Sequence, residues 1–216
     1  MMCSDFWIVS NRPFPNSVAS NPAELDRLIK SHEPETPKRI YSPFWSWKVP
    51  HSILEQCQCI GFHSAPLPRG KGGSPIQNMI RLGYCTTEIC AFKMTDDFDG
   101  GEVIARHTIS LDGTLGTIIE RISHIIKNMI NRLERNGKYN TTISGIYNNI
   151  PDKFKRIVDN TLVETDTLEC LYDEIRMRDE KNHPKAFIYH GKHAIEFTNA
   201  AMKEGEIIAN VRIIQT

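Results

Sequence analysis

Hydrophobic and polar positions along the chain predict alternating strands and helices. Short apolar runs, typical of buried strands, occur at residues 6–9, 39–41 and 57–62. Residues 21–29 place leucine and isoleucine on one helical face, behind an asparagine and a proline that favour a helix start. Residues 115–133 repeat isoleucine at helical spacing and predict a long amphipathic helix. We therefore expect an α/β fold with a mostly parallel sheet.

Composition changes beyond Asn136 and again near Thr167. Residues 138–165 are polar and loop-like, which is typical of a connector. A helix pattern follows Thr167, with Leu168, Leu171, Tyr172 and Ile175 on its expected inward face. Alternating positions then predict two or three short strands. The interpretation is a catalytic domain at 1–137, a connector at 138–165, and a small C-terminal α+β module at 166–216.

Charge and cysteine content limit the partners, the metal sites and the cellular compartment that we expect for this protein. The chain has 26 basic and 26 acidic residues, so no global field attracts nucleic acid or a membrane surface. No apolar run approaches the roughly 20 residues that a membrane helix needs, and no signal peptide is evident. Its six cysteines are irregularly spaced, without the pairs that zinc sites require. We expect a reduced, cytoplasmic, metal-free protein.

Candidate chemistry gathers in two stretches. The predicted strand at 57–62 runs into His63, which is followed by a loop rich in proline and glycine. A helix start follows at Ser74 and Pro75, where we expect the serine oxygen to cap free amides. Downstream, strand-like residues run into three acids, the last of which is Asp99, and then into a glycine pair. A carboxylate beside a histidine fixes its tautomer and raises its basicity, as a general base requires. Alone, the second stretch would be interpreted as an acidic hairpin turn.

Together the two stretches resemble the N10-formyltetrahydrofolate-dependent formyltransferase family. That family carries Asn-x-His, a Pro-containing loop with Arg-Gly, an Ala-Pro-Ile-like helix start and Leu-Asp-x-Gly. The corresponding segments here are Gly61-Phe62-His63, Ala65-Pro66-Leu67-Pro68-Arg69-Gly70, Ser74-Pro75-Ile76-Gln77 and Phe98-Asp99-Gly100-Gly101. Order and spacing agree from about Tyr41 to Arg132. The family usually has more chain before this region, so the resemblance implies a shortened Rossmann-like domain. The departure is Gly61, which stands where the family has its asparagine.

The resemblance implies roles for individual residues. His63 and Asp99 are the expected catalytic pair, and we consider the amide of Asn78 as a replacement for the family's asparagine, although a solvated helix asparagine is commoner. Residues expected beside the folate are Trp45, Ser46, Trp47, Val49, Leu67, Arg69, Thr95, Asp96 and Asp97. An isolated Trp-x-Trp would be interpreted as core packing. The implied cosubstrate is N10-formyltetrahydrofolate, with no metal.

Near its end the chain carries a helix with Ile175-Arg176 and a turn with Pro184-Lys185-Ala186-Phe187. These segments resemble the small module of formyltransferases that act on nucleotide-linked amino sugars. We therefore expect a small amine of that class as acceptor, with Asn11 as a hydrogen-bonding side chain and Arg12 or Lys155 for the pyrophosphate. A neutral chain argues against tRNA, because nucleic-acid binding needs a basic surface. Methionyl-tRNA or glycinamide ribonucleotide as acceptor stays open, as does a folate-binding homologue with impaired catalysis. No membrane partner is expected, and a homodimer is compatible with the sequence.

Overall fold

The computed structural model describes residues 5–136, 142, 145 and 147–216. Its central sheet has six strands in the order β2-β1-β3-β4-β6-β7. The first four lie parallel and the last two run antiparallel, so the sheet is mostly parallel, as predicted. These strands are β1 (Phe6–Val9), β2 (Ser17–Ala19), β3 (Arg39–Ser42), β4 (Gln58–His63), β6 (Thr86–Lys93) and β7 (Val103–Ser110).

Helices cover both faces of this sheet, as the alternation of side chains in β1 requires. Ile8 faces the cluster that contains α3 (Pro75–Arg81) and α4 (Leu115–Asn136), whereas Trp7 and Val9 face the cluster of α1 (Pro22–His32) and α2 (His51–Gln56). The Asn21 side chain accepts a hydrogen bond from the Glu24 amide, which confirms the predicted helix start. Helix α2 was not predicted, because six residues are too few for a clear periodicity.

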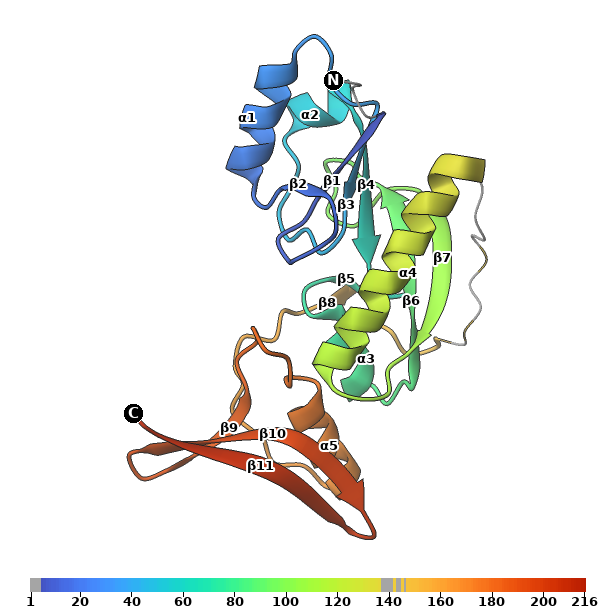
Figure 1. The fold of residues 1–216 in the computed structure, drawn as a ribbon. Coiled ribbons are helices and arrows are strands. Elements are labelled where there is room, and N and C mark those ends of the chain that lie inside the picture. The colour runs from blue at the N-terminus through green and yellow to red at the C-terminus, as the bar shows by residue number, and fades with distance from the viewer. Residues whose placement is uncertain (1–4, 137–141, 143–144, 146) are drawn as a thin grey trace.

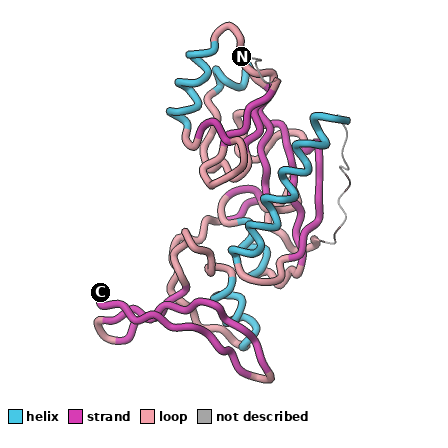
Figure 2. The backbone as a smooth tube through the Cα atoms, in the orientation of Figure 1, coloured by secondary structure: helices cyan, strands magenta, loops and turns pink. Residues whose placement is uncertain are grey.

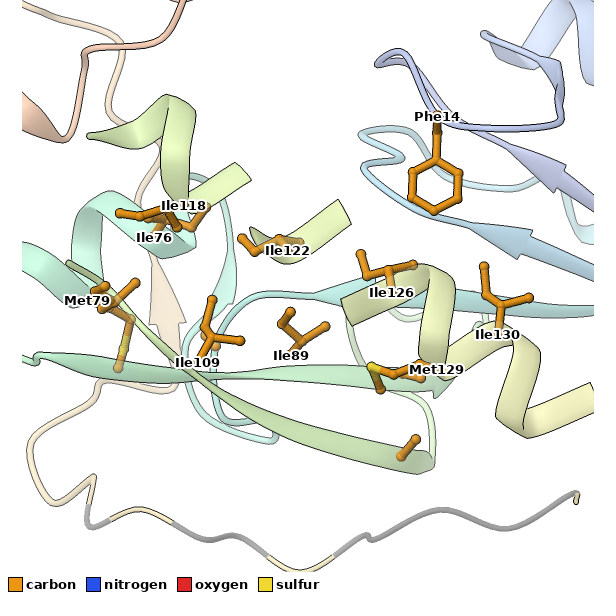
Figure 3. Close-up of a cluster of buried hydrophobic side chains, with 14 of the residues drawn as sticks. Phe14, Ile76, Met79, Ile89, Ile109, Ile118, Ile122, Ile126, Met129 and Ile130 are labelled. Carbon is orange, nitrogen blue, oxygen red and sulfur yellow. The ribbon is translucent and has the colours of Figure 1, made fainter. Parts of the chain in front are cut away.

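Helix α4 supplies the main apolar surface of the larger core. Figure 3 shows its isoleucines lying in a row above Ile89 and Ile109 of the sheet. Ile118, Ile122, Ile126 and Met129 are almost completely buried, so the predicted helical stripe is confirmed. Figures 1 and 2 show α4 crossing the sheet along most of its height.

The C-terminal part is a separate antiparallel sheet with one helix. Strands β9 (Ala186–His190), β10 (His193–Lys203) and β11 (Glu206–Gln215) pair in the order β11-β10-β9, and helix α5 (Leu168–Arg176) packs against β10. Two of these strands are longer than the short ones predicted. The predicted inward face of α5 was wrong at Leu168, which is 39% exposed, because the helix buries Glu174 and Arg176 against the first domain instead.

Buried charges join the two parts. Glu174 of α5 accepts two hydrogen bonds from the Arg81 guanidinium of α3, at 2.6 and 2.8 Å, and a third from Arg178 at 2.7 Å. Arg176 donates to the carbonyl oxygens of Leu111 and Gly113, in the turn between β7 and α4. The C-terminal module is therefore fastened to the larger domain by hydrogen-bonded charges.

The polar segment that we interpreted as a connector also binds the larger domain. Strand β8 (Lys153–Phe154) pairs in parallel with β5 (Lys71–Gly72), which lies in the loop after His63. The amide of Gly70 donates to the Pro151 carbonyl at 2.8 Å. The boundaries at 137 and 165 stay an interpretation of composition, but the second half of that segment holds the loop of the candidate site.

No helix in the described ranges is long and apolar enough to cross a membrane.

Candidate active site

A cavity of about 380 Å³ opens where β3 and β4 end. Its wall combines the loop after β1, the aromatic segment after β3, the end of β4, the loop before α3, the turn after β6 and the start of α4. His63 is the last residue of β4, as predicted, and is 6% exposed. The volume lies within the roughly 300–1,000 Å³ of small-molecule sites.

His63 and Asp99 meet in this cavity, although 35 residues separate them in the sequence. The Nδ1 atom of His63 lies 3.6 Å from Oδ2 of Asp99. Its Nε2 atom lies 2.7 Å from the Gly70 carbonyl oxygen, which can only accept, so Nε2 carries a proton. In the neutral ring Nδ1 is therefore the basic nitrogen, and it faces a carboxylate.

Asp99 is held by the loop that follows β4. Its Oδ2 atom accepts a hydrogen bond of 2.8 Å from the backbone amide of Gly72. Asp99 has a φ of 51°, in the left-handed region that aspartate and asparagine tolerate better than other side chains. Gly72 has a φ of 100°, and a side chain there would lie 2.7 Å from the Phe154 carbonyl oxygen. The close approach of Gly72 to the Phe154 backbone therefore fixes the amide that holds the Asp99 carboxylate.

Asn78 does not line the cavity. Its Nδ2 atom donates to the carbonyl oxygens of Gly73, Ser74 and Lys155, at 3.1, 2.9 and 3.0 Å. An amide NH₂ has only two protons, so these contacts use its donor capacity. The geometry gives Asn78 a bracing role between the loop, α3 and the segment around Lys155, and it does not favour the amide-replacement hypothesis.

Ser74 also differs from the prediction. It precedes α3, but its side chain makes no capping hydrogen bond and its φ is 51°. Its Oγ atom instead accepts a hydrogen bond of 3.0 Å from the Ile157 amide. The serine that was expected to cap the helix therefore holds the connector against the site.

At Gly61, where the family has its asparagine, the ring of Phe92 occupies the space that a side chain would take. Gly61 pairs with Phe92 across β4 and β6, so both face the same side of the sheet. A Cβ atom on Gly61 would lie 2.7 Å from Cζ of Phe92 and 3.2 Å from Cγ of Met94. Phe92 is 4% exposed and packs with Leu67 and Cys90. The glycine and the phenylalanine ring therefore fit each other.

We expect Gly61→Ala to lower the free energy of unfolding by about 1–3 kcal/mol, because the added methyl group overpacks the site. Gly116→Ala in α4 is the matched control, since its nearest neighbour would lie 3.6 Å away and alanine favours a helix. Urea unfolding of both variants, alone and with Phe92→Leu, measures the effect. An equal cost of Gly61→Ala in both backgrounds would contradict the fit.

The structure brings most of the predicted folate-side residues to the cavity but leaves out three of them. Trp45, Ser46, Trp47, Val49, Thr95 and Asp97 line its wall. Leu67 is buried beside Phe92, Asp96 lies 2.9 Å from His51 Nδ1, and the exposed Arg69 points to the Ile150 carbonyl, so none of these three lines it. The folate roles themselves stay predictions.

On the predicted acceptor side, Asn11 and Arg12 line the cavity and Lys155 does not. The neighbouring Arg156 takes its place, because Lys155 contributes its carbonyl to Asn78. Arg12 is paired with Glu180 at 3.3 Å. Side-chain direction in an irregular segment cannot be read from sequence, so the choice between Lys155 and Arg156 needed the structure.

Sequence reasoning missed one buried polar residue of the site. Ser42, the last residue of β3, lines the cavity and is 1% exposed. Its Oγ atom has no hydrogen-bond partner among the described residues, and neither has Nε1 of Trp45. The signal available in the sequence was the place of Ser42 at the carboxyl end of a strand, where ligands of such sheets bind.

A buried ion pair supports the loop from beneath. The Arg106 guanidinium lies 2.8 Å from Glu88 and donates to the Leu67 carbonyl at 2.6 Å.

Burial raises the pKa of the adjacent Cys90 thiol to about 12, so this cysteine is not a nucleophile at neutral pH. Over the described ranges, no three His, Cys, Asp or Glu side chains gather as a metal site.

Known proteins match this chain over its whole length in structure and over parts of it in sequence. The family model described as "Methionyl-tRNA formyltransferase, C-terminal domain" matches residues 158–214. The structure of methionyl-tRNA formyltransferase from Clostridium thermocellum is 33% identical, covers 98% of this chain and 99% of its own, and superposes with a TM-score of 0.84. The chain belongs to the formyltransferase family.

Two other comparisons show how far the similarity extends. It is 31% identical over 83 residues to methionyl-tRNA formyltransferase from Nitratiruptor, which is 38% of this chain but only 28% of that relative's length. HypX from Aquifex aeolicus, solved with tetrahydrofolic acid, is 17% identical with a TM-score of 0.62 over 93% of this chain and 39% of its own. At 17% identity, the similarity to HypX shows a shared fold.

Proposed function

We propose that this protein transfers a formyl group from N10-formyltetrahydrofolate to a primary amine. The observation that carries the proposal is the pair of His63, which is buried, and Asp99, which is partly buried, at the carboxyl end of β4 in a cavity of ligand size. Family membership agrees with it, and the complex of HypX with tetrahydrofolic acid supports a folate as the formyl donor. The aromatic segment with Trp45 and Trp47 offers flat apolar surface for a pteridine ring.

In this mechanism the lone pair of a neutral amine attacks the formyl carbon, and the carbonyl π electrons move to oxygen. His63 Nδ1 accepts the proton of the resulting ammonium, and Asp99 stabilises the imidazolium. The proton then passes to N10 as the bond between carbon and N10 breaks, with its electron pair going to nitrogen. The products are a formamide and tetrahydrofolate.

For the acceptor we propose a small amine attached to an anionic group, in the first place a nucleotide-linked amino sugar. Arg12, Lys48 and Arg156 line the cavity, with Asp97 and Asp99 as its acids. Cations around a pocket favour phosphate groups, whereas the whole chain is neutral and offers no broad field for tRNA. The second candidate is methionyl-tRNA, which the names of the C. thermocellum structure and the family model favour.

Incubation with labelled formyltetrahydrofolate and each acceptor separates the candidates. The panel contains nucleotide-linked amino sugars, glycinamide ribonucleotide and charged initiator tRNA. We expect formylated sugar, and Arg156→Gln should raise KM for it about tenfold by removing a charged hydrogen bond. Arg135→Gln, at the exposed end of α4, is the control. Formylated tRNA without formylated sugar would make the second candidate correct.

A further inference from the structure

Any reaction at a formyl carbon needs a hydrogen-bond donor for the oxygen that becomes negative. At the family's position for an amide donor this chain has Gly61, and the ring of Phe92 occupies the space of a side chain. Asn78, the other amide considered, is bound to three carbonyl oxygens. The donor must therefore come from another part of the wall.

Ser42 lies directly beside the glycine. Strands β3 and β4 are parallel, and Ser42 is in register with Gly61. Register partners project to the same face of a sheet. His63 lies two residues beyond Gly61 on β4 and shares that face. Gly61 is therefore flanked by Phe92 on one side and by the Ser42 hydroxyl on the other.

The state of the Ser42 hydroxyl points to a ligand. The residue is 1% exposed and lines the same cavity as His63, Asp99 and Gly61. Its Oγ atom has no hydrogen-bond partner within the described part of the chain. A buried hydroxyl without a partner is costly, and such groups in native proteins are as a rule satisfied. Among the other buried hydroxyls, that of Ser10 accepts from the Arg12 amide and that of Thr87 donates to the Ser64 carbonyl, whereas the Tyr147 hydroxyl also lacks a partner in the described ranges but lies outside the cavity.

We propose that Ser42 is a catalytic residue that donates a hydrogen bond to the formyl oxygen, in the place of the asparagine amide that Gly61 lacks. This inference rests on the proposed function. As the amine adds to the formyl carbon, the oxygen gains the carbonyl electron pair and the Oγ–H bond of Ser42 points its dipole at it. No proton leaves Ser42. When the bond to N10 breaks, the electron pair returns and the hydrogen bond weakens again.

The test compares Ser42→Ala with Ser42→Thr, which keeps the hydroxyl, and with Ser123→Ala as a control. Ser123 is a partly buried serine of α4 whose hydroxyl binds the Ile119 carbonyl, outside the cavity. For Ser42→Ala we expect formyl transfer to fall on the order of a hundredfold, the usual loss for one oxyanion donor. Ser42→Thr and Ser123→Ala should retain most of the rate.

A second measurement needs no acceptor. Wild-type protein binds formyltetrahydrofolate labelled at the formyl carbon, and infrared difference spectra report the carbonyl stretch. In Ser42→Ala the stretch should move to higher frequency, and affinity for the formylated folate should fall about tenfold relative to tetrahydrofolate. Equal losses for both folates, or an unchanged stretch and rate, would overturn the role of Ser42 while leaving formyl transfer intact. Failure of the wild type to bind formylated folate would overturn the proposed function and this role together.

Discussion

Asp99→Asn should fold like the wild type and lose formyl transfer on the order of a hundredfold. Asparagine has nearly the same shape, tolerates the φ of 51°, and can still accept the hydrogen bond from the Gly72 amide. What it removes is the negative charge 3.6 Å from His63 Nδ1. Without that charge the imidazolium that forms during proton transfer loses its main stabilisation.

Steady-state kinetics of three variants measure this effect. His63→Gln should be as slow as Asp99→Asn or slower, and the double variant should be little worse than His63→Gln, because both residues serve one proton transfer. His124→Gln, an exposed histidine of α4, is the control. Near-normal turnover of Asp99→Asn, with thermal unfolding unchanged, would show that the chemistry lies elsewhere.

Glu174→Gln should destabilise the protein by about 3 kcal/mol or more. The carboxylate is 5% exposed and accepts hydrogen bonds from Arg81 and Arg178. Removing one partner of a buried charged network leaves the others uncompensated, which typically costs about 3–5 kcal/mol. Glu169→Gln, an exposed substitution on the same helix, should change the free energy of unfolding by less than about 0.5 kcal/mol.

The same carboxylate should make the attachment of the C-terminal module sensitive to acid. Burial alone would raise the pKa of Glu174, but the hydrogen bonds from Arg81 and Arg178 outweigh it and lower the pKa below the usual value of a glutamate. The unfolded chain then binds a proton at higher pH than the folded one does. The contribution of Glu174 is complete above the ordinary carboxyl pKa and is lost as pH falls through the lowered value.

Urea unfolding from pH 7 down to pH 3 measures both effects. The wild type should lose stability as the pH falls, and Glu174→Gln should lose less over the same range, since its amide does not titrate. The difference between the two proteins should therefore shrink on acidification. Parallel curves would show that Glu174 contributes no pH-dependent stability, and an unchanged midpoint at pH 7 would contradict the network itself.

Local pattern was sufficient for the framework of the sheet. The apolar run at residues 57–62 predicted a strand ending at the histidine, and β4 ends at His63. The isoleucine repeat predicted α4, and Asn21 predicted the start of α1. Each of these depends on contacts within a few residues or on one buried face, which periodicity records directly. The resemblance further named His63 and Asp99, which the fold brings to one cavity.

The remaining features of the site depend on residues that are distant in the sequence. Ser74 resembles a helix cap, but the amide of Ile157 binds its hydroxyl, 83 residues away. Asn78 could donate to a ligand, yet its protons go to carbonyl oxygens that include that of Lys155. A polar side chain has several partners of similar energy, and only tertiary packing decides which one is within reach.

The sequence by itself determined the α/β class, the order of the main elements and the presence of a histidine and a carboxylate in family spacing. Tertiary structure alone decided that Phe92 fills the space beside Gly61 and that Ser42 lies at its other side. The physical reason is that strand register joins residues from β3, β4 and β6, and register follows from packing of the whole sheet. A missing side chain is visible in sequence, whereas the groups that surround its space are not.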